Sequence, residues 1–357
     1  MKVLLITGTY PPQKCGVGDY TLHLASALAR EPNIEVGVLT SYGAEDSSDA
    51  SRVRLFRTIT GWRLINLPQV RRVASEFRPD IVHIQYPSRD FNGKLPNILP
   101  IFFKLTGIPV VQTWHEHYRE CNQICWLNLL ACKTLLYVRP DLPNKLPIWV
   151  AKWLCMTHVA YVPNATTIPS QALSTTERLA IKRCLFGDRP VVCYFGFAHP
   201  NKGVERLFEI AAPDKHHLVL ICDLSENNPY QSRILGISHK APWAGNVTVT
   251  GFLSAKRVGE ILAVADAVVF PFPGGAGEWN TSLKAAEAAG TFILATTTNS
   301  NKLGYNKQGN IFFADCGDVS GMKAALHQYL GRRIVPKLVD EWRIISTAHT
   351  QAYNALL

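Results

Sequence analysis

Residues 3–30 read VLLITGTYPPQKCGVGDYTLHLASALAR, and they contain a short apolar strand, a loop rich in proline and glycine, and an amphipathic helix. From Tyr20 to Arg30 small and apolar residues recur at helical spacing on one face, and Pro32 prevents the helix from continuing. We expect this helix to follow Gly16 and Gly18. A buried strand, a turn and a helix in this order predict the first unit of a doubly wound α/β fold.

The same alternation of apolar strands and helical patterns continues along the 357 residues. In the first half the predicted strands are 3–7, 35–40, 52–57, 80–84, 109–113 and 134–138. After a loop at 163–169 a second series follows at 190–195, 217–222, 246–250, 267–270 and 291–296. We therefore predict two Rossmann-like α/β domains, residues 1–165 and 166–337, with a helix at 338–357 that packs back on the first domain. Ligands of such sheets bind at the carboxyl ends of the strands, so a cleft between the domains is the expected site.

Composition restricts the class of protein further. Apolar residues make up 47% and charged residues 18% of the chain, which is typical of a folded protein rather than a disordered one. The net charge of +10 favours an anionic partner, either nucleic acid, a phosphorylated small molecule or an acidic membrane. The nine cysteines are odd in number and mostly lie in apolar runs, which indicates a reducing, cytoplasmic compartment. Neither the amino-terminal run nor the apolar stretch 124–138 is long enough for a signal peptide or a spanning helix.

Two glycine-containing loops follow predicted strands of the second domain. The first, 196–204 (GFAHPNKGV), is expected to open a helix where Lys202 supplies a charge and Gly203 lets a phosphate approach the backbone. A plain turn with a solvated lysine fits that stretch equally well. The second, 271–282 (PFPGGAGEWNTS), carries Glu278 and ends in Thr281 and Ser282, which would contact a phosphate or cap the next helix. Glu278 is either a carboxylate at the mouth of the expected cleft or a solvated loop residue.

Taken together, these motifs resemble the retaining, GT-B fold glycosyltransferases of family 4, from the first strand to the last helix. Residues 11–21 (PPQKCGVGDYT) resemble the family's Pro-Pro, Gly-Gly-Val-Gly, Tyr-Thr loop, with Cys15 in place of the first glycine. Residues 79–83 (PDIVH) are similar to its Pro-Asp-Val-Val-His strand, and residues 109–116 (PVVQTWHE) to the strand that ends in its active-site histidine. Residues 249–254 and 290–295 resemble the segment beside the nucleotide base and the strand after the donor helix.

The resemblance implies transfer of a hexosyl or N-acetylhexosaminyl group from a nucleotide diphosphate sugar to an acceptor hydroxyl, with retention and without a metal or other cofactor. The catalytic residues that it implies are His115 and Glu278. The donor-binding residues are Gly16, Lys202, Gly203, Phe252, Leu253, Gly275, Thr281 and Ser282. His83, Gln85 and Tyr86 leave a strand toward the expected cleft and are candidates for contact with an acceptor glycan or lipid-linked sugar, although a mobile loop explains them equally well.

Two positions depart from the family's pattern. Phe197 stands where the family commonly has an arginine, so one positive partner of the diphosphate is absent. The family has two glutamates spaced eight residues apart, and Glu278 only approximates the position of the first. The second falls at Ala285, and Glu287 lies two residues further on, on another face of the helix. Thr281 and Ser282 would then make more of the contacts with the donor. Another GT-B activity, such as a sugar phosphate synthase, and a degenerate protein that binds a nucleotide sugar without turnover both stay open.

Two other classes of site are not expected. A zinc site at His115, His117, Cys121 and Cys125 would need a recognised ligand spacing, and none is present. Nucleic acid is not an expected partner, because the chain has no recognised nucleic-acid module and its glycines lie at strand-to-helix turns.

Residues 52–78 form a strongly basic segment. It has seven arginines and a single acidic residue, Glu76. The arginines are Arg52, Arg54, Arg57, Arg63, Arg71, Arg72 and Arg78. Apolar residues lie among them: Leu55, Phe56, Ile59, Trp62, Leu64, Ile65 and Leu67. This mixture predicts either a solvated basic face or a surface that rests on anionic headgroups through Arg54, Arg63, Arg71 and Arg72. The second possibility would make the protein a peripheral enzyme of the inner leaflet with a lipid-linked acceptor.

Overall fold

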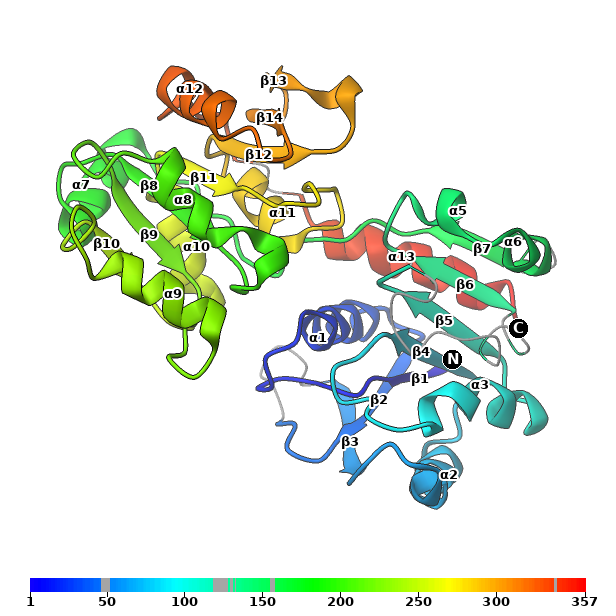
Figure 1. Cartoon of the computed structure of the whole chain (residues 1–357). Coiled ribbons are helices and arrows are strands. Elements are labelled where there is room, and N and C mark those ends of the chain that lie inside the picture. The colour runs from blue at the N-terminus through cyan, green and yellow to red at the C-terminus, as the bar shows by residue number, and fades with distance from the viewer. Residues whose placement is uncertain (46–51, 118–127, 129–130, 132, 155–157, 337–338) are drawn as a thin grey trace. The chain divides into compact units, whose positions relative to one another are not determined.

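The computed structural model of the chain describes residues 1–45, 52–117, 128, 131, 133–154, 158–336 and 339–357 (Figure 1). The chain divides into two compact units, unit 1 (Met1–Ala165 with Asp340–Leu357) and unit 2 (Thr166–Val339). Within the described ranges every helix is too short or too polar to cross a membrane.

Unit 1 is built on a parallel sheet of seven strands in the order β3-β2-β1-β4-β5-β6-β7. The strands are β1 (Lys2–Ile6), β2 (Glu35–Ser41), β3 (Val53–Ile59), β4 (Ile81–Tyr86), β5 (Val110–Trp114), β6 (Thr134–Tyr137) and β7 (His158–Tyr161). The helices are α1 (Gly16–Leu28), η2 (a 3₁₀ helix, Leu64–Asn66), α2 (Leu67–Phe77), α3 (Leu95–Leu105), α5 (Leu142–Lys145), α6 (Ile148–Leu154) and α13 (Glu341–Asn354).

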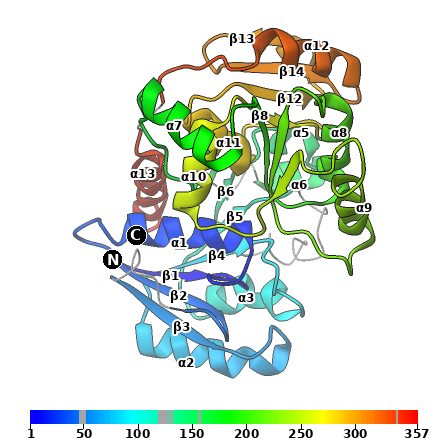
Figure 2. The same cartoon turned by 90° about the vertical axis from the view of Figure 1, so that its left-hand side faces the viewer.

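The helices cover both faces of this sheet, because successive side chains of a strand point to opposite faces. Leu4 and Ile6 of β1 belong to a core cluster with Val73 of α2. Val3 and Leu5 belong to a second cluster with residues of α1 and α13. The carboxyl-terminal helix α13 therefore lies beside α1 as part of unit 1, which both views show (Figures 1 and 2).

Unit 2 repeats the arrangement, with the strand order β10-β9-β8-β11-β12-β14-β13. Its strands are β8 (Val191–Phe195), β9 (His217–Ile221), β10 (Val247–Val249), β11 (Ala267–Phe270), β12 (Ile293–Thr297), β13 (Gly304–Asn306) and β14 (Ile311–Asp315). Only the pairing of β13 with β14 is antiparallel among these described strands. The helical segments are α7 (Thr175–Phe186), η3 (Pro200–Lys202), η4 (Val204–Arg206), α8 (Leu207–Ile210), α9 (Pro229–Ser238), α10 (Ala255–Val264), α11 (Thr281–Ala288), η5 (Ser300–Lys302) and α12 (Val319–Tyr329).

The predicted fold class, two Rossmann-like doubly wound sheets, is confirmed. Two local predictions were wrong. The first helix begins at Gly16 and includes Gly18 rather than following both glycines. Gly18 is needed for close packing on the loop after β1, because a Cβ atom there would lie 2.9 Å from the carbonyl oxygen of Thr9. After Gly203 the chain forms short 3₁₀ turns and the four-residue helix α8, so no long helix opens at Lys202.

Candidate active site

His115 immediately follows β5 at the carboxyl edge of the unit 1 sheet. Its backbone N–H donates to the carbonyl oxygen of Tyr86 at 2.7 Å, and its ring Nε2 lies 2.9 Å from Oε1 of Gln85. The ring of Tyr20 packs edge-on against it with 4.8 Å between the centroids. Burial, with a smaller effect from His349, lowers the pKa of His115 to about 3. His115 is therefore a neutral imidazole at physiological pH, suited to orienting a ligand by hydrogen bonding.

The three predicted acceptor residues lie beneath His115 and not at the surface. His83, Gln85 and Tyr86 are each 0% exposed, because β4 is an inner strand of a sheet covered on both faces. The hydroxyl of Tyr86 donates to the carbonyl oxygen of Pro96 at 2.5 Å. In this structure none of the three presents surface to an acceptor, and we correct their assignment: they form the buried support of His115.

The start of α1 is open to a ligand. Cys15, the N-cap residue, makes no side-chain capping bond, and a Cβ atom added at Gly16 would meet no atom within 4 Å. The first N–H groups of a helix carry partial positive charge and bind anions. Asp19 lies in the same first turn, and burial raises its pKa to about 6. The sequence interpretation did not single out Asp19, although an acid beside the glycines is visible there.

In unit 2 the two glycine-containing loops pack directly on each other. At Gly203, which has φ of 60°, a Cβ atom would lie 2.5 Å from the carbonyl oxygen of Pro271. The ammonium group of Lys202 lies over the ring of Phe272 at 4.2 Å from its centre. A Cβ atom at Gly196 would lie 3.0 Å from Oγ of Ser282. The loops after the neighbouring strands β8 and β11 thus form one continuous surface at the carboxyl edge of the sheet.

The second loop is held in place by its own backbone contacts. Gly275 has φ of 79°, and a Cβ atom there would lie 3.0 Å from the backbone nitrogen of Thr298. Asn280 is the N-cap of α11, and its side-chain oxygen accepts the N–H of Gly277 at 2.7 Å. Thr281 is therefore the first residue of α11 and not its cap. Thr281 and Ser282 are half-buried in the first turn, where free N–H groups are available for a phosphate.

Glu278 is exposed and forms an ion pair across the loop. Its Oε1 lies 2.9 Å from Nζ of Lys302 in η5. The sequence interpretation missed Lys302, which lies 24 residues further along and outside any motif. Ala285 is buried in the core, and Glu287 lies 3.9 Å from Lys284 on a different face of α11. The second glutamate of the family pattern is thus absent from this position.

An aromatic pair replaces the expected arginine. Phe197 and Phe252 are 44% and 54% exposed, and their ring centroids lie 6.5 Å apart. Gly251, with φ of 68°, turns the chain just before Phe252, while Leu253 packs against the core of unit 2. The departure at Phe197 therefore supplies apolar surface beside the segment predicted to contact the nucleotide base.

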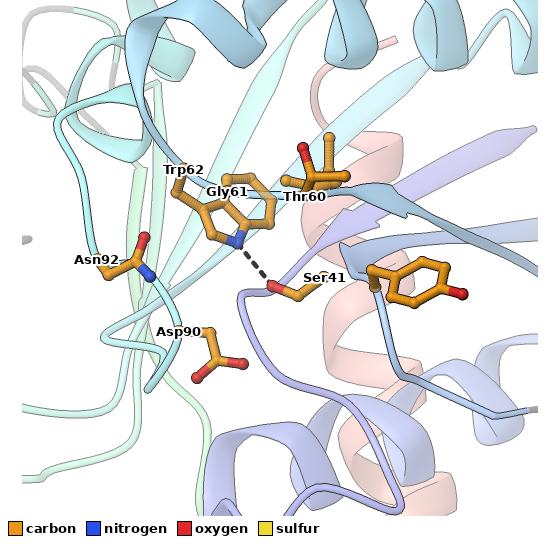
Figure 3. A pocket seen from close by; sticks show the side chains of 8 residues that line it. Ser41, Thr60, Gly61, Trp62, Asp90 and Asn92 are labelled. Carbon is orange, nitrogen blue, oxygen red and sulfur yellow. Dashed lines mark hydrogen bonds between the residues drawn. The ribbon is translucent and has the colours of Figure 1, made fainter.

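A polar cavity of about 300 Å³ lies in unit 1 at the carboxyl ends of β2 and β3, beside the loop after β4 (Figure 3). Its lining residues are Ser41, Tyr42, Ile59, Thr60, Gly61, Trp62, Asp90 and Asn92. Nε1 of Trp62 donates to Oγ of Ser41 at 2.8 Å and so fixes one wall (Figure 3). The carboxylate of Asp90 and the amide of Asn92 provide hydrogen-bonding groups of the kind that sugars require.

The basic segment is exposed as predicted, but most of its apolar residues are not. All seven arginines are exposed, and Arg54 pairs with Glu76. Phe56, Ile59 and Trp62 are buried in the core, so they cannot contact a membrane. Leu64 and Ile65 of η2 are 51% and 84% exposed. The surface that combines exposed apolar and basic side chains is therefore the turn η2 with the neighbouring arginines of α2.

The described residues contain no group of three or more histidines, cysteines or acids placed to hold a metal ion. His117 instead approaches Asp141, with 3.1 Å between Nε2 and Oδ2. Cys121 and Cys125 lie outside the described residues.

Two seven-stranded sheets, parallel except for the pairing of β13 with β14, with glycine-containing loops at their carboxyl edges, define the GT-B class of fold. Residues 15–173 match the family model described as Glycosyltransferase Family 4, and residues 189–332 match the model described as Glycosyl transferases group 1. The chain belongs to glycosyltransferase family 4, whose retaining enzymes transfer a sugar from a nucleotide-sugar donor. No curated protein sequence matches it significantly.

Solved structures show the same fold at low sequence identity. Sucrose-phosphate synthase from Thermosynechococcus elongatus is 16% identical with a TM-score of 0.67, over 99% of this chain and 94% of that one. HepE of Anabaena in complex with UDP-glucose is 14% identical with a TM-score of 0.67, over 100% and 99% of the two chains. WaaG, a glycosyltransferase involved in lipopolysaccharide biosynthesis, is 13% identical with a TM-score of 0.60, over 99% and 95%.

Proposed function

We propose that this glycosyltransferase moves a hexosyl or N-acetylhexosaminyl group from a nucleotide diphosphate sugar to a hydroxyl group of a glycan or lipid-linked acceptor, in the cytoplasm. The observation that carries the proposal is the joint surface of loops 196–204 and 271–282 in unit 2. It combines a fixed cation at Lys202, the start of α11 at Thr281 and Ser282, and the exposed pair Phe197 and Phe252. Cation, N–H groups and apolar rings match the diphosphate and base of a nucleotide.

In this proposal the leaving diphosphate is stabilised by the chain's own groups. Lys202 and the free N–H groups of α11 face the charge that develops as the glycosidic bond breaks, and such preorganised groups act most strongly where water is excluded. Gly16 at the start of α1 adds further N–H groups. The leaving phosphate accepts the proton of the attacking hydroxyl, because the sequence offers no obvious enzymic base. His115, a neutral imidazole, orients the donor sugar.

The test is a panel of nucleotide sugars, including UDP-glucose, assayed for thermal stabilisation and for turnover. A donor that binds only the folded chain must raise its melting temperature. Lys202→Ala should lower turnover by about 10²–10³-fold without changing the melting temperature of the free protein. Lys323→Ala, which removes an exposed lysine of α12, is the matched control. Undiminished turnover in Lys202→Ala refutes the assignment, and stabilisation without any turnover identifies a degenerate binding protein.

Glu278 is proposed to accept hydrogen bonds from hydroxyl groups of the donor sugar. Glu278→Gln should then weaken binding of the full donor more than binding of the free nucleotide diphosphate. Lys302→Met is the matched control, because it breaks the ion pair and keeps the carboxylate. An equal loss for both ligands in Glu278→Gln would assign the residue to the nucleotide.

The acceptor site is proposed at the polar cavity of unit 1 rather than at His83, Gln85 and Tyr86. Cavities of this volume are large enough for small ligands. Asp90→Ala and Asn92→Ala should raise KM for the acceptor and leave the affinity for the donor unchanged. A parallel loss of donor affinity would contradict this location.

A lipid-linked acceptor would agree with contact between η2 and an anionic membrane. Leu64 and Ile65 offer exposed apolar side chains beside Arg63, Arg71 and Arg72. Each basic residue near an acidic bilayer contributes about 1 kcal/mol, so changing these three arginines to serine should weaken binding to anionic vesicles by about 100-fold. Arg54→Ser, at an arginine already paired with Glu76, should have a smaller effect. Equal binding to neutral vesicles, or no binding to either kind, would leave a soluble acceptor.

A further inference from the structure

The carboxyl-terminal helix α13 supplies two buried polar side chains to the support of His115. His349 and Tyr353 are each 0% exposed, and α13 lies beside α1 in unit 1 (Figure 2). The ring of His83 lies 5.4 Å from the ring of His349 and 5.7 Å from that of Tyr353, between centroids. Residues separated by 270 positions thus meet beneath the candidate catalytic histidine.

Hydrogen bonds connect Tyr353 to His115 in an unbroken series. The hydroxyl of Tyr353 lies 2.6 Å from Nδ1 of His83. Nε2 of His83 lies 3.2 Å from Nε2 of Gln85. Oε1 of Gln85 lies 2.9 Å from Nε2 of His115. Every residue of the series is at most 9% exposed, so water does not replace these bonds.

The donors and acceptors of the series can be assigned from their chemistry. Because Oε1 of Gln85 only accepts, Nε2 of His115 must carry the proton. Because the amide nitrogen of Gln85 only donates, Nε2 of His83 must be the unprotonated nitrogen. Both histidines are neutral because burial lowers their pKa values, so the proton of His83 is on Nδ1 and is donated to the oxygen of Tyr353.

The assignment leaves Nδ1 of His115 with a lone pair. This nitrogen makes no hydrogen bond to any residue in the part of the chain that the structure describes. It can accept a hydrogen bond from a sugar hydroxyl and cannot donate one. If His115 held its proton on Nδ1, the same ring would present a donor instead.

We propose that Tyr353 is a positioning residue that acts through His83 and Gln85 to hold the proton of His115 on Nε2, so that Nδ1 accepts a hydrogen bond from a hydroxyl group of the donor sugar. The role of His115 toward the sugar rests on the function proposed above, whereas the position of its proton does not. The carboxyl-terminal helix thereby helps to determine how the sugar is recognised.

Removal of the Tyr353 hydroxyl should exchange the donors and acceptors in this series of hydrogen bonds. In Tyr353→Phe a proton on Nδ1 of His83 would be a buried donor without a partner, which proteins avoid more strongly than an unpaired acceptor. The proton of His83 should therefore move to Nε2, where Oγ1 of Thr113 lies 2.7 Å away and can accept it. Gln85 then turns its amide by half a turn, and its N–H group faces Nε2 of His115. The proton of His115 must move to Nδ1.

The experiment is ¹⁵N NMR of the histidine rings, which distinguishes the two neutral forms, in the full-length chain at neutral pH. Assignment uses His115→Gln and His83→Gln. The wild-type protein should show His115 protonated on Nε2 and His83 on Nδ1, and Tyr353→Phe should show both positions exchanged. Thr113→Val is the matched control, since it removes a hydroxyl from His83 outside the series and should leave both ring forms unchanged.

Kinetics provide the second measurement. Loss of one hydrogen bond to the sugar should lower kcat of Tyr353→Phe by about tenfold, with little change in affinity for the free nucleotide diphosphate. Thr350→Val removes another hydroxyl of α13, one that bonds only within the helix, and should keep kcat. Wild-type His115 protonated on Nδ1, or an unchanged ring form in Tyr353→Phe, overturns the proposal. Because the wild-type spectrum needs neither the variant nor turnover, absence of transferase activity would count against the proposed function alone.

Discussion

Acid should destabilise unit 1 through its three buried histidines. Burial lowers the pKa of His115 to about 3 and that of His349 to about 4, and it lowers the pKa of His83 as well. In the unfolded chain each ring takes up a proton near its ordinary pKa of about 6.5. The unfolded state therefore binds more protons below this pH. The contribution of the neutral rings to stability is complete above pH 6.5 and is lost as the pH falls toward the folded values.

The size of the effect follows from proton binding. Between pH 7 and pH 5, protonation stabilises each unfolded histidine by about 2 kcal/mol, so His115 and His349 together contribute about 4 kcal/mol. The lowered pKa of His83 adds a loss of the same sign. Asp19 opposes them in the same range. Burial raises its pKa to about 6, so the folded state takes up a proton there and regains about 1 kcal/mol. The net loss is a large fraction of the stability of a typical domain.

His349→Met isolates the contribution of one of these histidines. Nδ1 of His349 bonds the carbonyl oxygen of Ile345 at 2.8 Å, and its Nε2 is buried without a partner among the described residues, so a methionine gives up little. Urea unfolding of both proteins should show their difference in stability shifting by about 2 kcal/mol in favour of the variant between pH 7 and pH 5. The contribution of Asp19 cancels in that difference.

His158→Met is the control, because His158 is exposed on β7 and its substitution should leave the pH dependence as it is. If His349→Met and the wild-type protein lose stability in parallel as the pH falls, then His349 is not held neutral by burial. The neutral state assigned to His83 and His115 would then lack support as well.

Three further substitutions test other buried charges and close contacts. Asp19 has a folded pKa above its unfolded one, so its proton stabilises the fold below about pH 4, and this stabilisation is lost as the pH rises through 6. Asp19→Asn should therefore raise the free energy of unfolding, measured with urea, by about 3 kcal/mol at pH 7 and by less than about 1 kcal/mol at pH 4. The ammonium group of Lys182 lies 2.9 Å from the buried carboxylate of Asp266. Lys182→Met should lower the free energy of unfolding of unit 2 by about 3 kcal/mol, because it leaves that carboxylate without its closest cation. An unchanged melting temperature would contradict the burial of the pair. Gly203→Ala places a Cβ atom 2.5 Å from the carbonyl oxygen of Pro271, at a residue with φ of 60°. It should lower the free energy of unfolding by about 1–3 kcal/mol and weaken nucleotide binding measured by calorimetry. Wild-type values for both quantities would show that the two loops do not need this close contact.

The amino-acid sequence by itself determined the fold class and the candidate loops. Buried parallel strands appear as short apolar runs and helices as a period of 3.6 residues, and both patterns are local. The sequence did not predict three strands, β7, β13 and β14. β7 is an edge strand of the unit 1 sheet, and β14 and β13 are the last two strands at one edge of the unit 2 sheet. Burial is incomplete there, so the apolar pattern is weak. The glycine-rich loop 271–282 and the strand that ends before His115 were also recognisable from the sequence. Turns and strand ends depend on the conformation of consecutive residues, so they leave a local sequence pattern as well.

Only the tertiary structure decided which of these residues meet. His83, Gln85 and Tyr86 follow one another on a strand, and their spacing does not show that helices cover both faces of it. The pairing of Glu278 with Lys302 and of Phe197 with Phe252 depends on how separate loops pack. Tyr353 reaches His83 because α13 packs on the sheet of unit 1. Local periodicity determines secondary structure, whereas contacts between distant segments depend on how whole elements bury their apolar faces together.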